Sequence, residues 1–304
     1  MKYPSPSSSD TVIAVNELSC RFGNVLALDG ASLYVPRGAV FGLVGENGAG
    51  KTTLIKHLLG LLTPLSGTVR VFGQDPVAES VGVLSRIGYL SEHRELPQWM
   101  RIDELIRFTA AFYPAWDAQY AKQLQEQFHL DPAARVRSLS QGQQAKAGLL
   151  LALAYRPELL ILDEPSTGLD PVVRREILEA IIHTIAEEGR SVLFSSHLLD
   201  EIERVSDQVA MIHHGKVVLH GPLDGVKQAH RWLTIRFPQP LPKAPCIPGA
   251  LAVQGAGREW RILCNGTPAN WPAIARELGG EVVDEKTPTL DEIFVARVKG
   301  VGAP

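Results

Sequence analysis

The chain has 304 residues, of which 45% are hydrophobic and 21% are charged, and its formal net charge is -3. This composition is typical of a globular protein large enough to bury one large core or two smaller ones. Asp and Glu number 33 against 30 Lys and Arg, so the basic excess typical of nucleic-acid-binding proteins is lacking and we expect no nucleic-acid partner. The longest apolar runs fall short of the roughly 20 residues of a membrane-spanning helix, so we expect no membrane span.

The first residues and the cysteines carry no sign of a secreted protein. Residues 1–10 are rich in Ser and Pro and have no apolar core, which predicts a disordered tail rather than a signal peptide. Cys20, Cys246 and Cys264 lie far apart and lack the spacing of a metal site. We expect all three to be reduced thiols, buried as small hydrophobic side chains in a protein of the cytosol.

A glycine-rich loop follows the apolar run 39–44, and it reads Gly45-Glu46-Asn47-Gly48-Ala49-Gly50-Lys51-Thr52-Thr53. It matches G-x-x-x-x-G-K-[ST], a loop whose backbone N–H groups surround phosphates. The apolar run predicts a strand and residues 53–62 have the period of a helix, which is the context that the motif requires. We expect Lys51 to bind the β and γ phosphates and Thr52 to bind Mg²⁺.

The remaining segments up to residue 220 alternate between strands and helices. Strands are predicted over 12–15, 32–35, 67–73, 86–90, 159–162, 191–195, 208–212 and 216–220. Helices are predicted from Ile102, with Asp103 near the cap, to Pro114, from Asp117 to about Phe128, and over 145–154 and 172–187. The alternation predicts an α/β fold with a parallel sheet, whose strand ends carry the functional residues.

Beyond Gly221-Pro222 the segments become shorter and prolines more frequent. Strands are predicted over 232–237, 259–264 and 281–283, and helices over 271–278 and 290–298. We interpret residues 226–304 as a small α+β accessory domain.

Two acidic residues, Asp163 and Glu164, end the apolar run 159–162. A carboxylate at that place can hold the Mg²⁺ that bridges the β and γ phosphates, and the next carboxylate can polarise an attacking water. His197 follows the predicted strand 191–195 and could contact the γ phosphate, although a structural role for a lone histidine stays open.

Together these motifs resemble those of ABC-type ATPases. The matching segments are Gly45–Thr52 (Walker A), Leu139-Ser-Gln-Gly-Gln143 (the signature), Leu159–Glu164 (Walker B), Ser166-Thr-Gly-Leu-Asp170, and Ser-Ser-His ending at His197. The resemblance covers about residues 12–220, and the signature is its most specific part. It implies a P-loop NTPase fold of the ABC ATPase type over residues 11–225, with a mixed sheet and a helical subdomain at about 92–145.

The resemblance also implies a role for each matching residue. Phe22 would stack on adenine, with a packed core phenylalanine as the open alternative. Glu164 would be the general base and His197 would sense the γ phosphate. Asp170 would lie at the junction between two subunits packed head to tail. The residues that would close over ATP bound to the second subunit are Ser140, Gln141, Gly142 and Gln143.

Two positions depart from the family pattern. Glu92 stands where the family usually has glutamine; it could still bind Mg²⁺, but it adds negative charge beside a triphosphate. Gln141 stands where the signature usually has glycine. These changes, with the stretch 112–117, are similar to ATPases of bacterial ABC-2 type exporters.

This resemblance implies a subunit that binds ATP and Mg²⁺, dimerises, hydrolyses ATP and drives a separate membrane permease, in export. It would lie in the cytoplasm, on the inner face of the cell membrane through that permease; homodimer and heterodimer both stay open. The alternative is a soluble ABC-type ATPase of translation or DNA repair, but the sequence has neither tandem halves nor a coiled coil. A regulator without catalysis fits less well because Lys51, Glu164 and His197 are all present.

Overall fold

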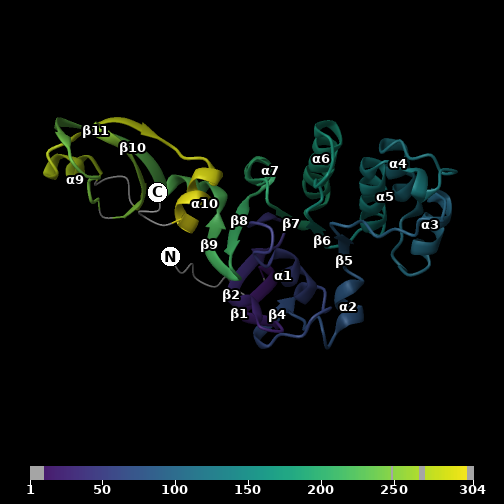
Figure 1. Cartoon of the computed structure of the whole chain (residues 1–304). Helices are drawn as coiled ribbons and strands as arrows, with labels where there is room; N and C mark the ends of the chain where they lie inside the picture. The colour runs from purple at the N-terminus through teal and green to yellow at the C-terminus, as the bar shows by residue number, and fades with distance from the viewer. Residues whose placement is uncertain (1–9, 248, 267–270, 300–304) are drawn as a thin grey trace. The chain divides into compact units, whose positions relative to one another are not determined.

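The computed structural model describes residues 10–247, 249–266 and 271–299. The chain divides into two compact units between His220 and Gly221 (Figure 1). The sequence analysis predicts this boundary five residues later, after residue 225. Of the predicted tail, only Asp10 belongs to the described residues.

The first unit is built on a six-stranded sheet in the order β5-β6-β7-β3-β8-β9. The first five of these strands are all parallel, so their carboxyl ends share one edge of the sheet. All residues of β3 and β6 are buried, as expected of central strands covered on both faces. The bounds are β3 Val40–Val44, β5 Ile87–Leu90, β6 Leu159–Asp163, β7 Ser191–Ser196, β8 Gln208–His213 and β9 Lys216–Pro222.

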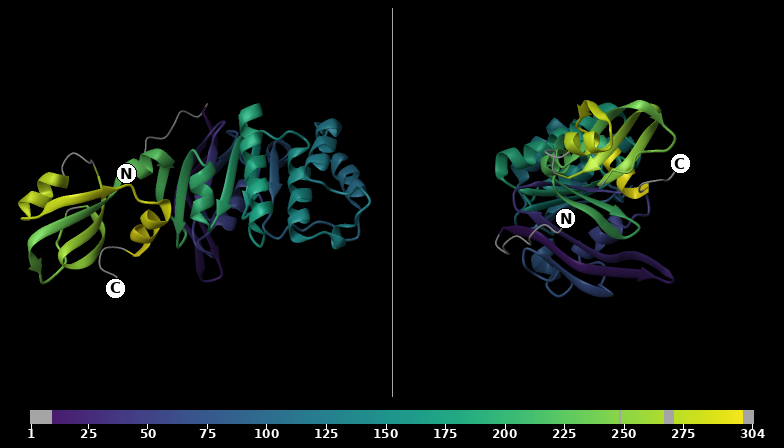
Figure 2. Two further views of the ribbon diagram at one scale, coloured as in Figure 1. Left: turned by 90° about the horizontal axis from the view of Figure 1, so that it is seen from above. Right: turned by 90° about the vertical axis from the view of Figure 1, so that its left-hand side faces the viewer.

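A second, antiparallel sheet has the order β2-β1-β4, with bounds β1 Thr11–Phe22, β2 Val25–Pro36 and β4 Ser66–Val71. It forms a layer beside the larger sheet, seen as the purple strands in the right-hand view of Figure 2. β1 and β2 are much longer than predicted. Register shifts interrupt their pairing, and Glu17 has a φ of 48°, so bulges break the period-2 pattern that the sequence analysis relied on.

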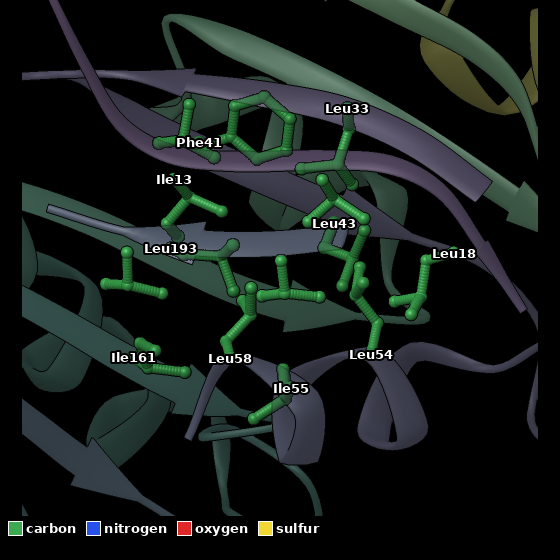
Figure 3. Packing of buried hydrophobic residues seen from close by; sticks show 14 of the residues in the cluster. Ile13, Leu18, Leu33, Phe41, Leu43, Leu54, Ile55, Leu58, Ile161 and Leu193 are labelled. Atoms are coloured by element: carbon green, nitrogen blue, oxygen red, sulfur yellow. The ribbon is translucent and has the colours of Figure 1, made fainter. Parts of the chain in front are cut away.

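Helix α1 (Lys51–Leu58) packs between the two sheets. Figure 3 shows its Leu54, Ile55 and Leu58 turned toward side chains of β1, β2, β3, β6 and β7. The predicted end at residue 62 is wrong, because Gly60 takes a φ of 67° and ends the helical backbone before it.

The helical segment contains α3 (Ile102–Ala110), α4 (Ala118–Gln127), a short 3₁₀ turn (Val136–Ser138) and α5 (Gln141–Leu153). The cap predicted at Asp117 is confirmed, since its carboxylate accepts from the Tyr120 N–H at 2.8 Å. The predicted start of α5 at residue 145 is wrong, because Ser140 and Gln143 form a capping box that starts the helix at Gln141. The other helices of this unit are α6 (Pro171–Glu188), as predicted, and α2 (Ser80–Leu84) and α7 (Leu199–Val205), which were not predicted.

The second unit has an antiparallel sheet in the order β11-β10-β12. One face carries the core of Leu233, Ile235, Ile262 and their neighbours, and the other face packs Trp232 and Leu263 against Ala296. The bounds are α8 Leu223–Gln228, β10 His230–Leu241, β11 Ala250–Asn265, α9 Trp271–Glu277, β12 Glu281–Lys286 and α10 Leu290–Lys299.

The cysteines differ in burial. Cys20 and Cys264 are buried free thiols, as predicted, whereas Cys246 is exposed, so its predicted burial is wrong. It lies in the proline-rich link between β10 and β11. Among the described residues, no helix is both long and apolar enough to cross a bilayer.

Candidate active site

The glycine-rich loop joins the carboxyl end of β3 to the start of α1. Gly48 and Gly50 have φ values of 81° and 114°, a backbone conformation that residues with a side chain rarely adopt. A Cβ at Gly45 would lie 2.4 Å from the carbonyl oxygen of Ile212, and one at Gly50 would lie 2.7 Å from that of Ala27. Side chains at these glycines would therefore displace neighbouring backbone, and the loop keeps the open form that a phosphate group requires.

A pocket of about 270 Å³ opens above this loop. Its walls come from segments far apart in the sequence. Glu92 and Glu164 both lie beside the loop, where the sequence analysis expects them. The lining residues are Ala27, Asn47, Gly48, Gly50, Lys51, Thr52, Thr53, Glu92 and Glu164. The other predicted loop residues, Gly45, Glu46 and Ala49, lie in the same loop but do not line the pocket.

Lys51 and Glu164 form a buried ion pair at the floor of the pocket. The Lys51 Nζ lies 3.0 Å from Oε1 of Glu164, and it also donates to the carbonyl oxygens of Gly45 at 2.6 Å and Glu46 at 3.3 Å. Burial alone would raise the pKa of Glu164, but hydrogen bonds and charge from Lys51 and His197 outweigh burial and lower it. The carboxylate is therefore ionised at neutral pH, as an acceptor of a proton from water must be.

Three further donors hold the second oxygen of Glu164. Its Oε2 accepts from Thr167 Oγ1 at 3.2 Å and lies 2.7 Å from the Nδ1 of His197, whose backbone N–H is 3.4 Å away. The backbone of Glu164 has a φ of 49° and donates to the Ser195 hydroxyl at 3.0 Å. A strained backbone maintained by several bonds is typical of a functional position.

Asp163 ends β6 next to the pocket. It is 1% exposed, and its Oδ1 accepts a hydrogen bond from Ser195 Oγ at 2.6 Å. The structure thus brings Asp163, Glu164 and His197 together at the edge where β6 and β7 end, although Asp163 and His197 do not line the pocket itself.

The signature residues lie at the exposed start of α5, away from the pocket lining. Ser140 caps the helix, and Gln143 completes the capping box. Gln141 lies over Gly168, since its Oε1 would be 3.0 Å from a Cβ there. Gly142 packs against Val173, which leaves no room for a side chain. Asp170 accepts from the N–H groups of Val172 and Val173 at 3.0 and 3.1 Å, so it caps the start of α6.

Phe22 lies at the end of β1 and is 50% exposed. The alternative of a packed core phenylalanine is therefore wrong. The ring does not line the phosphate pocket, and its face remains available to a flat ligand.

Two buried charged residues near the site were missed. Glu201, in the first turn of α7, accepts from Ser166 Oγ at 2.6 Å and Ser196 Oγ at 3.2 Å, and its Oε1 lies 3.2 Å from Arg174 Nε. Burial raises its pKa. Arg94 is 8% exposed and donates to two backbone carbonyls of the segment that follows Glu164. The only sequence signal was their proximity to Glu92 and His197, because their partners lie far away in the chain.

A phosphate loop after a central strand, with a buried acidic pair at the end of the next strand but one, defines a P-loop ATPase cassette. Comparisons with known proteins agree. The family model described as "ABC transporter" matches residues 28–167. The daunorubicin resistance ATP-binding protein DrrA3 of Streptomyces coeruleorubidus is 35% identical over 224 residues, covering 72% of this chain and 71% of that protein. The chain therefore belongs to the family of ABC transporter ATP-binding proteins, and it is an ATP hydrolase.

Two further matches add detail. The ABC transporter ATP-binding protein YtrB of Bacillus subtilis (strain 168) is 27% identical over 289 residues, which covers 95% of this chain and 99% of YtrB. A solved structure titled "Structure of ATP binding subunit of ABC transporter" is 30% identical, with a TM-score of 0.66, and covers 71% of this chain and 92% of its own. The match to YtrB covers so much of the chain that it includes most of the second unit. The share of the chain covered by the solved structure is about that of the first unit alone.

Proposed function

We propose that the pocket binds the triphosphate of ATP, with residues 45–53 around the phosphates and Phe22 on the adenine. Lys51 lies 5% exposed at the pocket floor, where phosphate oxygens would compete with Glu164 for its ammonium group. Once Lys51 turns to phosphate, Glu164 can accept a proton from the attacking water, while His197 and Thr167 hold its other oxygen.

Mg²⁺ fits this pocket. Mg²⁺ takes one or two protein carboxylates and completes its shell with substrate phosphates and water, and Thr52 and Glu92 place a hydroxyl and a carboxylate in the pocket lining. Thr52, Asp163 and Glu92 would supply the hydroxyl and carboxylate oxygens. When bound, the ion would neutralise charge on the β and γ phosphates.

Two chains would be needed for each complete site. The observation that carries this proposal is the position of Ser140, Gln141, Gly142 and Gln143 at a helix start outside their own chain's pocket. The first-turn N–H groups of α5 suit an anion, and a second chain packed head to tail would bring them to the γ phosphate of its partner. Asp170, whose carboxylate accepts from the first-turn N–H groups of α6, would lie at that junction.

Mixing two inactive variants tests this arrangement. Lys51→Ala disables the phosphate loop and Ser140→Arg blocks the signature, so each homodimer has no intact site. A mixed dimer would pair the intact loop of one chain with the intact signature of the other. Random mixing should restore about a quarter of wild-type hydrolysis, since half of the dimers would be mixed and each would hold one intact site. If the mixture stays as inactive as each variant alone, this chain does not form such homodimers.

We also propose that an apolar groove of about 350 Å³ receives the permease. It lies between the helical segment and the end of α1, and a nonpolar groove of this kind suits a short helix of a partner. Exposed Phe108 lies on the adjoining α3 and exposed Phe112 lies two residues beyond its end, with ring centroids 5.1 Å apart. The lining residues are Leu59, Leu61, Leu84, Ile87, Tyr89, Thr109, Tyr113, Leu151, Ala152 and Tyr155.

This docking would hold the chain on the inner face of the cell membrane. Copurification of a permease from membranes, with identification of the bound protein, tests it: Leu151→Arg in the groove should abolish capture, whereas Trp99→Ser, 70% exposed in the same helical segment but outside the groove, should not. Equal capture by both variants would contradict this docking site. Transport in the direction of export is supported by similarity to DrrA3, whose name concerns daunorubicin resistance. We treat residues 226–304 as an accessory domain of this subunit.

A further inference from the structure

Arg94 is a buried charged residue beside the site, and the reaction proposed above leaves it unused. It follows β5 by four residues, close behind Glu92, and is 8% exposed. A buried guanidinium is costly unless its donors are matched. One nitrogen, Nη2, donates to the carbonyl oxygens of Pro165 at 3.1 Å and Thr167 at 2.7 Å. β5 and β6 are neighbours in the sheet (Figure 1). Arg94 therefore bridges the loops that follow two adjacent strands.

One end of this bridge, Thr167, is hydrogen-bonded to the general base Glu164. Thr167 accepts from Arg94 through its carbonyl and donates through Oγ1 to Oε2 of Glu164 at 3.2 Å, and its N–H donates to the Glu164 carbonyl at 3.2 Å. Thr167 is thus held on one side by Arg94 and itself holds Glu164. The other end of the bridge is the turn that carries Glu92, closed by the bond from Arg94 N–H to Ser91 O at 3.2 Å.

Two features of Arg94 go beyond what a simple structural link requires. Its φ is 47°, an unfavourable conformation for a residue with a side chain, and Glu164 at the far end has a φ of 49°. Within the described residues its Nε–H has no hydrogen-bond acceptor although it is buried. Burial lowers the pKa of Arg94 and the negative charge of Glu92 opposes that change, so the two groups interact through space.

We propose that Arg94 is a positioning residue for hydrolysis, which ties the Glu92 turn to Thr167 and so fixes the Glu164 carboxylate when Glu92 engages the phosphate–metal group. The inference rests on the placement of the triphosphate proposed above. A carboxylate at position 92 repels the triphosphate, and the neighbouring guanidinium offsets part of that charge. Arg94 acts through Thr167 and does not touch the nucleotide.

The test measures kcat, ATP affinity and thermal stability of the full chain for a set of variants. Arg94→Ala should lower kcat about tenfold or more while the Kd for a fluorescent ATP analogue changes less than about threefold, since misplacing a catalytic group acts on the rate. Arg94→Lys should restore part of the rate, because an ammonium can donate to a carbonyl but lacks the planar fork. Arg101→Ala is the control: its guanidinium also donates to a backbone carbonyl, that of Ala133 at 2.9 Å, but neither residue lines the pocket, and kcat should stay at the wild-type value.

A double-mutant cycle separates positioning from general stabilisation. Thr167→Val removes the hydroxyl that donates to Glu164, so Arg94→Ala should lower kcat less in this background than in the wild type. Strictly additive losses, an unchanged kcat in Arg94→Ala, or a loss fully accounted for by unfolded protein would overturn the inference. If instead the wild-type chain does not bind the analogue, the proposed ATP site itself fails, so the two failures are distinct.

Discussion

The two units of the chain bury different kinds of polar group. In the first unit the ends of β5, β6 and β7 lie beside buried acidic and basic side chains, among them Lys51, Asp163, Glu164 and Glu201, each held by named partners. In the described part of the second unit the buried polar residue is a histidine, His230, between apolar cores on both faces of its sheet. Since replacing buried charges with apolar groups often stabilises a fold, charges kept beside a pocket indicate chemistry, and their scarcity in the second unit indicates packing.

Removing the general base tests the comparison most strongly. Glu164→Gln keeps the shape and most hydrogen bonds but cannot accept a proton, so hydrolysis should fall by about 10³-fold with ATP binding retained. Steady-state phosphate release and analogue binding measure both. Glu158 serves as the control, because its side chain is 50% accessible and it directly precedes β6, at the other end of the strand from Glu164. Glu158→Gln should leave the rate unchanged. A Glu164→Gln enzyme with full steady-state rate would contradict the assignment of Glu164.

The reverse experiment damages the second unit alone. Trp232 is 6% exposed, packs with Leu263 and Ala296, and has the Arg261 guanidinium 4.9 Å from its ring centre. Trp232→Ala should therefore destabilise this unit by about 3 kcal/mol. Hydrogen exchange read by mass spectrometry reports each unit separately in the full chain. Loss of protection should be confined to residues 221–299, and a matching loss around the phosphate pocket would show that the units do not behave separately.

A smaller effect is expected at the nucleotide base. Phe22→Ala removes an aromatic face and should raise the Kd for ATP about tenfold, whereas Phe22→Tyr should bind about as tightly as the wild type. Val25→Ala, 68% exposed near the same strand end, is the matched control. Isothermal titration with ATP measures all three. Equal affinity of Phe22→Ala and wild type would show that adenine is held elsewhere.

The sequence was sufficient for elements whose pattern is local. The continuous apolar runs of β3 and β6 predicted central strands, and Asp117 predicted a helix start, because these signals depend on neighbouring residues. The bulges of β1 and β2 hid two long strands by breaking the alternation of apolar and polar residues. The start of α5 was missed because Ser140 and Gln143 act as a capping pair, a signal that was present but not used.

The candidate site was predicted only as far as its motifs extend. Lys51, Glu92 and Glu164 lie in one pocket, because their motifs follow parallel strands whose carboxyl ends share one edge of the sheet. The supporting residues Arg94 and Glu201 could not be found in this way. Their partners, Thr167 for Arg94 and Ser166 for Glu201, are brought close only by the folded chain.

The smallest expected effect is a pH response of the second unit. His230 Nδ1 lies 2.7 Å from Val226 O, and Arg297 Nη2 lies 3.1 Å from its Nε2, an arrangement suited to the neutral ring. Burial lowers its pKa, with Arg297 adding to this and the bond to Val226 opposing it. The unfolded chain, whose histidine pKa is about 6.5, therefore binds a proton first as pH falls. Stability that is complete above about pH 6.5 should therefore fall as the pH is lowered from there to about pH 5.5.

Hydrogen exchange at the two pH values, corrected for the intrinsic rates, measures this loss in residues 221–299. His220 of the first unit also has a pKa lowered by burial, so both units should lose protection in the wild type. His230→Gln provides the separation: it should flatten the response of the second unit and leave that of the first unchanged. A response in the second unit that persists in His230→Gln would mean that another group titrates there. The interior of the second unit would then contain a second buried ionisable residue, and its contrast with the charged interior of the first unit would be weaker.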